Sequence, residues 1–301
     1  MKKVGSIGVG NMGMGMARNI LRKGFGLTVY DIREEPLKEL AQLGAQVAKT
    51  SRGVGEKSDV VLIMVFDGSQ VNEVVLAEEG LLEGMRPGST IICTSTIFPS
   101  EIKQVAEVVE KKGIYMVDSP VSGGPIRSAK GELTLMVAAK KDVFENCQDI
   151  FQAIGKDIYH VGEEIGMGQV TKAAHQVLVG ATFAGMAEAL VLGVKAGVKA
   201  EVLYEVMGSG VAGSFLFKSI AKQVMERNFK TSGNIGTMHK DLSISMEVGK
   251  ECNLPLYATA VAYEMLKATK GLFPEDDVGA IVKTVEKIAG VEVKNHMLKQ
   301  K

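Results

Sequence analysis

The chain has 301 residues, which is enough for two domains that each bury a hydrophobic core. Lysine plus arginine and aspartate plus glutamate each number 35, so no basic excess points to nucleic acid or to an anionic membrane surface. The three cysteines form no CxxC pair, which argues against a zinc knuckle or a disulfide framework and favours a reducing cytoplasm.

The first half of the chain alternates between strand-like and helix-like segments. We expect strands at residues 4–9, 27–30, 60–65, 89–93, 114–118, 133–138 and 158–161, and helices at 12–21, 34–43, 100–112 and 142–153. The run at 60–65 is continuously apolar, as in a strand that is covered on both faces. This alternation predicts a parallel sheet with right-handed crossovers, so residues 1–163 are assigned to an α/β Rossmann-type domain.

The second half lacks strand signals. Residues 168–197 carry small and apolar residues at helical spacing and predict one long helix, followed by helices at 201–207, 215–227, 238–251, 256–268 and 277–289. Residues 164–301 are therefore expected to form a long interdomain helix and an all-α C-terminal domain. The many alanines and glycines of the long helix allow close packing of neighbouring helices, including those of a second subunit.

Two apolar segments bear on the expected location of the protein. The start of the chain resembles a signal peptide only superficially, since several glycines interrupt its apolar run. The apolar stretch of the long helix contains His175, Gln176 and Glu188, which favours a buried helix in a soluble protein over a membrane span. We expect a cytoplasmic protein without a membrane partner.

A glycine-rich turn follows the first predicted strand and opens the first helix. In Gly8-Val9-Gly10-Asn11-Met12-Gly13, the glycines permit a tight turn whose backbone N–H groups approach a pyrophosphate at the helix N-terminus. The pattern alone is weak, but Asp31 follows the second strand, where a carboxylate hydrogen-bonds a ribose hydroxyl pair; a solvated loop acid is the alternative. A carboxylate there repels a 2′-phosphate and favours NAD over NADP, although Arg33 is either a surface residue or a partner for such a phosphate.

One face of the long helix carries three polar residues. Lys172, His175 and Gln176 are spaced i, i+3 and i+4 and therefore share that face. From periodicity alone, Lys172 is explained equally well by a side chain that reaches solvent and by one that lies in a cleft. His175 by itself is more typical of an interior histidine with satisfied hydrogen bonds. No histidine and carboxylate cluster has metal-ligand spacing, so no metal is expected.

Four motifs in order resemble those of the β-hydroxyacid dehydrogenases. They are the turn at 8–13, the segment Asp118-Ser-Pro-Val-Ser-Gly-Gly124, the run Gly168-Gln-Val-Thr-Lys172 and the pair Lys240-Asp241, and they span nearly the whole chain. The resemblance implies an NAD-dependent oxidoreductase that acts on a short hydroxy acid. It also implies a Rossmann-type domain, a long connecting helix, a helical domain that helps to bury the active site, and a homodimer or homotetramer.

The resemblance assigns roles residue by residue. Lys172 matches the catalytic lysine. The implied cofactor contacts, besides Asp31, are Gly8, Gly10, Asn11, Met12 and Gly13 at the pyrophosphate, Val65 and Phe66 on the adenosine side, Thr96 near the nicotinamide ribose, and Lys240. The implied substrate contacts are Ser122, Gly123, Gly124, His175 and Gln176. A serine hydroxyl and free N–H groups at 122–124 form an anion-binding nest suited to a carboxylate. Phe66 stands where the family usually has proline.

The residue four positions after the predicted catalytic lysine departs from the family pattern. Most members have asparagine four residues after the catalytic lysine, whereas this chain has Gln176, preceded by His175. This His-Gln pair resembles the L-threonate dehydrogenase branch, as do the segments 94–97 and 131–134. Gln176 is still able to orient a substrate hydroxyl, one methylene further from the backbone. We therefore expect an acid other than 3-hydroxyisobutyrate and favour a four-carbon sugar acid.

The expected chemistry is a paired transfer of a hydride and a proton. The nicotinamide takes the hydride from the carbinol carbon, and neutral Lys172 takes the hydroxyl proton. A free lysine has a pKa of about 10.4, and burial beside a cationic nicotinamide is expected to lower the pKa of Lys172. Three other functions stay open: an NADPH-dependent reductase of succinic or tartronic semialdehyde, a non-catalytic NAD-binding protein, and an imine reductase. Imine reductases usually carry aspartate or tyrosine in place of this lysine.

Overall fold

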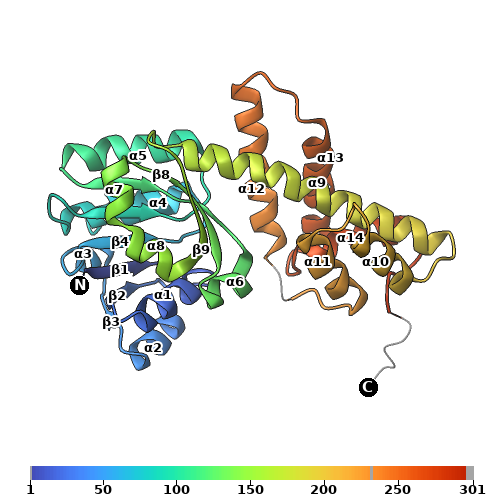
Figure 1. Cartoon of the computed structure of the whole chain (residues 1–301), viewed down its shortest axis with the longest axis horizontal. Helices are drawn as coiled ribbons and strands as arrows, with labels where there is room; N and C mark the ends of the chain where they lie inside the picture. The colour runs from blue at the N-terminus through green and yellow to red at the C-terminus, as the bar shows by residue number, and fades with distance from the viewer. Residues whose placement is uncertain (1, 231–232, 296–301) are drawn as a thin grey trace. The chain divides into compact units, whose positions relative to one another are not determined.

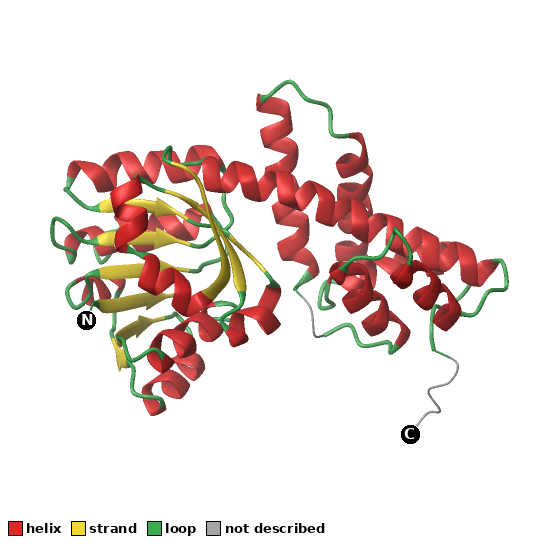
Figure 2. Cartoon of the chain, in the orientation of Figure 1, coloured by secondary structure: helices red, strands yellow, loops and turns green. Residues whose placement is uncertain are grey.

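The structure is a computed structural model that describes residues 2–230 and 233–295 (Figure 1). The chain forms two compact units, residues 1–172 and 173–301, and helix α9 (Met167–Lys195) begins in the first and continues into the second. The first unit combines strands and helices, whereas the described part of the second is helical (Figure 2). The predicted fold class, a Rossmann-type α/β domain followed by a helical domain, is confirmed.

Within the described residues, the first unit is built around one nine-stranded sheet. Its strands are β1 (Lys3–Ile7), β2 (Gly26–Tyr30), β3 (Gln46–Val47), β4 (Val60–Ile63), β5 (Thr90–Cys93), β6 (Tyr115–Asp118), β7 (Val121–Ser122), β8 (Leu133–Ala138) and β9 (Gly155–Gly162). The order is β3-β2-β1-β4-β5-β6-β8-β7, with β9 paired to β8. Neighbours from β3 to β6 are parallel, whereas β8 is antiparallel to β6 and β7. The strand order reverses between β1 and β4, where open parallel sheets bind ligands.

Helices cover both faces of this sheet. They are α1 (Gly13–Arg22), α2 (Glu34–Gln42), α3 (Ser51–Gly55), α4 (Gly68–Leu76), the 3₁₀ turn η1 (Leu81–Glu83), α5 (Pro99–Lys111), α6 (Gly124–Lys130), α7 (Lys141–Asn146) and α8 (Gln148–Ile154). In β4, Val60 and Leu62 join the buried cluster that contains α1 and α8, whereas Val61 and Ile63 join the cluster that contains α4 and α5. Because successive strand residues face opposite sides, burial on both sides explains the continuous apolar runs.

Two predicted helices are divided in the structure. Residues 142–153 form α7 and α8, because Cys147 between them leaves the helical region at φ −97° and ψ 4°. Residues 277–289 begin with the 3₁₀ turn η2 (Val278–Ala280) before α14 (Ile281–Ala289). Asp277 caps this turn, since its side chain accepts a hydrogen bond from the Gly279 N–H at 2.9 Å.

The second unit packs helices around its own core. After α9 come α10 (Ala200–Ser209), α11 (Phe215–Met225), α12 (Ile235–Glu251), α13 (Tyr257–Leu272), η2 and α14. Among the helices in the described part of the chain, α9 alone is long and apolar enough to cross a membrane by length and composition. It also supplies Phe183, Ala187 and Leu190 to the buried cluster of the second unit, which is the role of a core helix.

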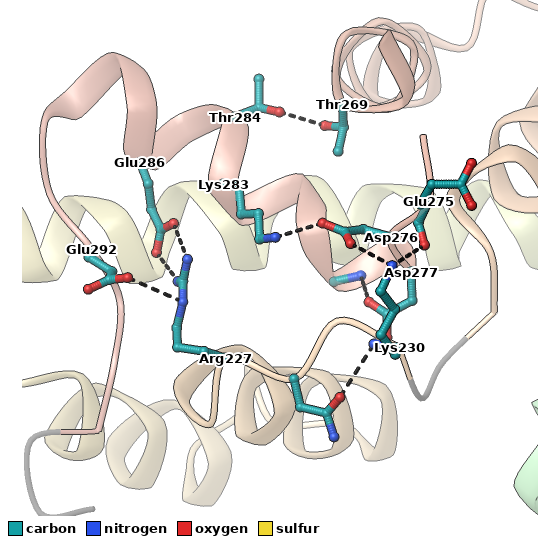
Figure 3. A network of polar contacts seen from close by, with 12 residues as sticks. Arg227, Lys230, Thr269, Glu275, Asp276, Asp277, Lys283, Thr284, Glu286 and Glu292 are labelled. Atoms are coloured by element: carbon teal, nitrogen blue, oxygen red, sulfur yellow. Dashed lines mark hydrogen bonds and ion pairs between the residues drawn. The ribbon is translucent and has the colours of Figure 1, made fainter. Parts of the chain in front are cut away.

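A charged network ties the segment before α12 to the end of the second unit (Figure 3). Arg227 forms two hydrogen bonds with the Glu286 carboxylate, at 2.6 and 3.1 Å, in the paired geometry that makes such contacts strong. Lys283 donates to Asp276 at 2.6 Å and lies 4.0 Å from the centre of the Phe229 ring. These contacts connect residues 227–229 to residues 276–286.

Candidate active site

The predicted glycine turn lies at the carboxyl end of β1 and opens helix α1. Gly8 has a φ of +80°, which favours glycine, and a Cβ atom there would meet the Met64 carbonyl group. A Cβ atom at Gly13 would meet the carbonyl oxygen of Gly8. The backbone is therefore tightly packed at the N-terminus of α1, where a pyrophosphate approaches the amide groups of the helix. These residues fit a dinucleotide cofactor.

Asp31 follows β2 and holds the glycine turn directly. Its carboxylate accepts hydrogen bonds from the backbone N–H groups of Val9 at 2.8 Å and Arg33 at 2.9 Å. The Arg33 guanidinium donates to it at 3.1 and 3.3 Å. Burial raises the pKa of Asp31, but the hydrogen bonds from Arg33 and Val9 outweigh burial and hold this pKa below its ordinary value. The carboxylate is thus kept ionised next to the turn.

The loops after β4 and β5 carry the next predicted cofactor residues. Val65 is half-buried, and its N–H donates to the Ser95 hydroxyl at 2.9 Å. Phe66 is 48% exposed, and its N–H donates to Gln70 in helix α4 at 2.8 Å. Thr96 is half-buried in the loop after β5. Because β4 and β5 are parallel, both loops lie at the same edge of the sheet as the glycine turn.

The predicted substrate residues span the end of β7, where Ser122 is the last residue, and the start of α6 at Gly124. Gly123 and Gly124 have φ values of +136° and +67°, so two successive residues need the conformational freedom of glycine. The loop leads into α6, where the Ser128 hydroxyl donates to the Met12 carbonyl oxygen at 2.6 Å. This hydrogen bond connects the substrate loop, through α6, to the glycine turn.

Lys172 stands near the start of α9, in the same unit as these loops, and is 6% exposed. The start of α9 is anchored by Asp118, the last residue of β6, which is fully buried. Burial raises the pKa of Asp118 to about 6, although hydrogen bonds from Gln169 and from the backbone of Gly166 act to lower it. Neither Asp118 nor Gln169 has a role predicted from the sequence, although both lie inside the quoted motifs.

Within the second unit, a hydrogen-bond network joins residues of α9 and α12. The Gln176 side-chain amide donates to the Asp241 carboxylate at 2.7 Å, and its oxygen faces His175 Nδ1 at 3.0 Å. Lys240 Nζ lies 3.1 Å from the other oxygen of Asp241. The predicted residues His175, Gln176 and Lys240 are therefore joined through Asp241, which is buried. Asp241 had no predicted role, and its only signal was its place beside Lys240 in the fourth motif.

Comparison with known proteins agrees with this arrangement. A family model for the NAD-binding domain of 6-phosphogluconate dehydrogenase matches residues 3–162. A second, for the NAD-binding part of NADP-dependent 3-hydroxyisobutyrate dehydrogenase, matches residues 166–285. The two models together cover almost the whole chain.

Individual relatives align over nearly their full length. The chain is 36% identical to 2-(hydroxymethyl)glutarate dehydrogenase of Eubacterium barkeri over 97% of each chain. It is 32% identical to L-threonate dehydrogenase of Haemophilus influenzae, over 93% of this chain and 94% of the relative. A solved structure of 3-hydroxyisobutyrate dehydrogenase from Salmonella typhimurium superposes with a TM-score of 0.88 at 28% identity, covering 94% of this chain and 100% of that one.

Proposed function

The chain belongs to the β-hydroxyacid dehydrogenase family, and on this premise we propose that it interconverts a short hydroxy acid and the corresponding oxo acid or semialdehyde with NAD. The observation that carries the proposal is the burial of Lys172. Lysine is among the residues that are almost never fully buried in proteins. This lysine shares its unit with the glycine turn and the substrate loop, where an amine is useful for acid–base chemistry.

Each group of residues has a distinct task in this proposal. The amides of the glycine turn bind the pyrophosphate, and the Ser122–Gly124 loop binds the substrate carboxylate. Lys172 accepts the hydroxyl proton of the substrate during oxidation and returns it during reduction. NAD, when bound, supplies the hydride acceptor. Gln176, held by Asp241, has the proposed role of orienting the substrate hydroxyl together with His175, and Lys240 that of a cofactor contact.

Replacing Lys172 tests this assignment. We expect Lys172→Ala to lose turnover by about a thousandfold or more, since a positioned proton-transfer group contributes 10²- to 10⁴-fold. Its Kd for NADH, measured by fluorescence titration, should stay within about threefold of wild type because the glycine turn is untouched. Lys141→Ala, at an exposed lysine in α7, is the matched control. Turnover near the wild-type level in Lys172→Ala would contradict the proposed function.

The proposal favours NAD over NADP because of Asp31. Its ionised carboxylate, held by Val9 and Arg33, repels a 2′-phosphate. The kcat/KM values for NAD and NADP with the same acid test the preference directly. A clear preference for NADP would instead support the NADPH-dependent semialdehyde reductase.

The proposed substrate is a short hydroxylated acid, with a four-carbon sugar acid first. The His175–Gln176 pair and the similarity to an L-threonate dehydrogenase support this choice. A panel of C3 to C6 acids with NAD, including threonate, erythronate, glycerate and 3-hydroxyisobutyrate, tests it. Tight NADH binding without turnover of any acid would support a non-catalytic protein, and reduction of cyclic imines but not semialdehydes would support an imine reductase.

We further propose a cytoplasmic homodimer or homotetramer. Helix α9 exposes Leu178 at 72% and Leu192 at 71%, which are large apolar side chains for a solvated surface. Light scattering coupled to size-exclusion chromatography measures the mass in solution. A monomer at micromolar concentration would contradict this part of the proposal.

A further inference from the structure

A buried pair of side chains joins β6 to the first turn of α9. Asp118 and Gln169 are both fully buried. The Asp118 carboxylate accepts hydrogen bonds from the backbone N–H groups of Gly166 at 2.9 Å and Gln169 at 3.2 Å. These groups belong to the start of α9, where N–H groups have no partner inside the helix and where a negative charge is favourable. The other carboxylate oxygen accepts from the Gln169 side-chain amide at 2.8 Å.

The same amide also holds the loop after β5. Gln169 Nε2 donates to the Ser95 carbonyl oxygen at 3.1 Å, and Gln169 Oε1 accepts from the Ile97 N–H at 3.0 Å. The two contacts flank Thr96, the residue expected near the nicotinamide ribose. The orientation of the amide is determined, because a carboxylate and a carbonyl require a donor and the Ile97 N–H requires an acceptor.

Helix α9 packs closely against the end of β6 where Asp118 meets Gln169. A Cβ atom added at Gly168 would lie 2.8 Å from the Asp118 carbonyl oxygen and 2.9 Å from its carboxyl carbon. Glycine therefore lets the helix approach the strand closely enough for Gln169 to reach both Asp118 and the loop. Lys172 follows Gln169 by three residues on the same helix and so shares its face.

We propose that Asp118 and Gln169 form a clamp that fixes Lys172 relative to the Thr96 loop, with Gln169 as a positioning residue. This inference rests on the proposed role of Lys172. One amide connects the backbone on both sides of Thr96 to the helix that carries the amine. If the clamp opens, the helix start and the loop move independently, and the distance between the proton-accepting amine and the cofactor site is no longer fixed.

Replacing the hydrogen-bond donor of the clamp, the Gln169 side-chain amide, with an acceptor tests the proposal. Gln169→Glu keeps the size of the side chain but places a carboxylate against Asp118 and the Ser95 carbonyl. We expect kcat for the best acid of the panel to fall by about 10- to 100-fold, with KM within about threefold. The double variant Asp118→Asn with Gln169→Glu restores a donor–acceptor pair, because only one carboxylate oxygen of Asp118 faces the side chain of Gln169. The double variant should recover at least about half of the decrease in log kcat that Gln169→Glu causes.

Amide hydrogen exchange gives a readout that does not depend on turnover. In Gln169→Glu, exchange at Ile97 and in the first turn of α9 should rise by about tenfold or more, and the double variant should reverse much of this rise. Gln42→Glu, at an exposed glutamine in α2, is the matched control. If Gln169→Glu does not fold, Gln169→Met, which removes the hydrogen bonds without adding charge, is measured in the same way.

The outcomes separate this inference from the proposed function. Normal kcat and normal exchange in Gln169→Glu or Gln169→Met, beside an inactive Lys172→Ala, would overturn the clamp alone. A loss of kcat that the double variant does not reduce would also overturn it. Full activity in Lys172→Ala would overturn the proposed function whatever the Gln169 variants do.

Discussion

Asp31 and Asp118 lie at equivalent places in the sheet, yet their surroundings differ in charge. Each carboxylate follows or ends a parallel strand, and each accepts hydrogen bonds from the backbone N–H groups of a neighbouring loop or helix. Asp31 additionally meets the cationic side chain of Arg33, and its pKa is lowered despite burial. Asp118 meets neutral donors, and burial raises its pKa to about 6.

This difference shows that backbone geometry alone does not set the ionisation of a strand-end carboxylate. Backbone N–H groups donate to both residues, but Asp118 is more deeply buried and its pKa shift is dominated by desolvation, whereas hydrogen bonds from Arg33 and Val9 outweigh burial at Asp31. Asp31 is suited to a site where a fixed negative charge selects a cofactor. Asp118 is suited to accepting the hydrogen bonds of a helix start from neutral donors.

The largest expected effect is that of removing Asp118. Asp118→Ala leaves the N–H groups of Gly166 and Gln169 and the Gln169 amide without their acceptor, and we expect the free energy of unfolding to fall by about 4 kcal/mol. Urea denaturation at pH 7 measures this change. Asp142→Ala, at an exposed aspartate in the first turn of α7, should change it by less than about 0.5 kcal/mol. Equal effects of the two substitutions would mean that the clamp adds nothing to stability.

The pH dependence of stability should reveal the raised pKa of Asp118. The folded chain holds the Asp118 proton up to about pH 6, whereas the unfolded chain releases it near 3.8. Between these values the folded state binds more protons, so its unfolding free energy decreases as the pH rises, by up to about 3 kcal/mol. The difference in stability between wild type and Asp118→Asn, measured from pH 4 to pH 7, isolates this term. A difference that stays constant over that range would refute it.

Neutralising Asp31 should change cofactor preference. Asp31→Ser removes the charge that repels a 2′-phosphate while leaving a hydroxyl near the Val9 N–H. We expect the ratio of kcat/KM for NADP to that for NAD to rise by about 30-fold, which corresponds to about 2 kcal/mol. Glu34→Ser, at an exposed acid in the first turn of α2, is the control. An unchanged ratio would show that the preference is set elsewhere.

The smallest expected effect is that of Arg33. Its side chain is 55% exposed, so its ion pair with Asp31 is partly screened by solvent, and Arg33→Ala should cost less than about 1 kcal/mol of stability. The pKa of Asp31 should move up, since the largest lowering contributions come from Arg33. Carboxyl ¹³C NMR titration of wild type and Arg33→Ala measures this shift. No upward shift would contradict the electrostatic explanation for Asp31.

Much of the first unit was predictable because its signals are local. Its strands are apolar runs, and the positive φ of Gly8 and the close approach of Gly13 to the Gly8 carbonyl oxygen lie within one strand–turn–helix segment. Cys147 divides a predicted helix by leaving the helical region. Helix α6 was not expected, and its contact with the glycine turn joins residues far apart in the sequence, which periodicity does not encode.

The sequence by itself determined the class of fold, the glycine turn, the acid that follows the second strand, and the lysine on the long helix, because periodicity and short motifs encode them. Only the tertiary structure decided what surrounds Asp118 and Gln169. Their contacts join residues 51, 72 and 74 positions apart, and the order of strands in the sheet brings these residues together. The contact between Asp31 and Arg33 is local in the sequence, whereas the neutral amide that meets Asp118, and the deep burial that raises the pKa of Asp118, depend on that order.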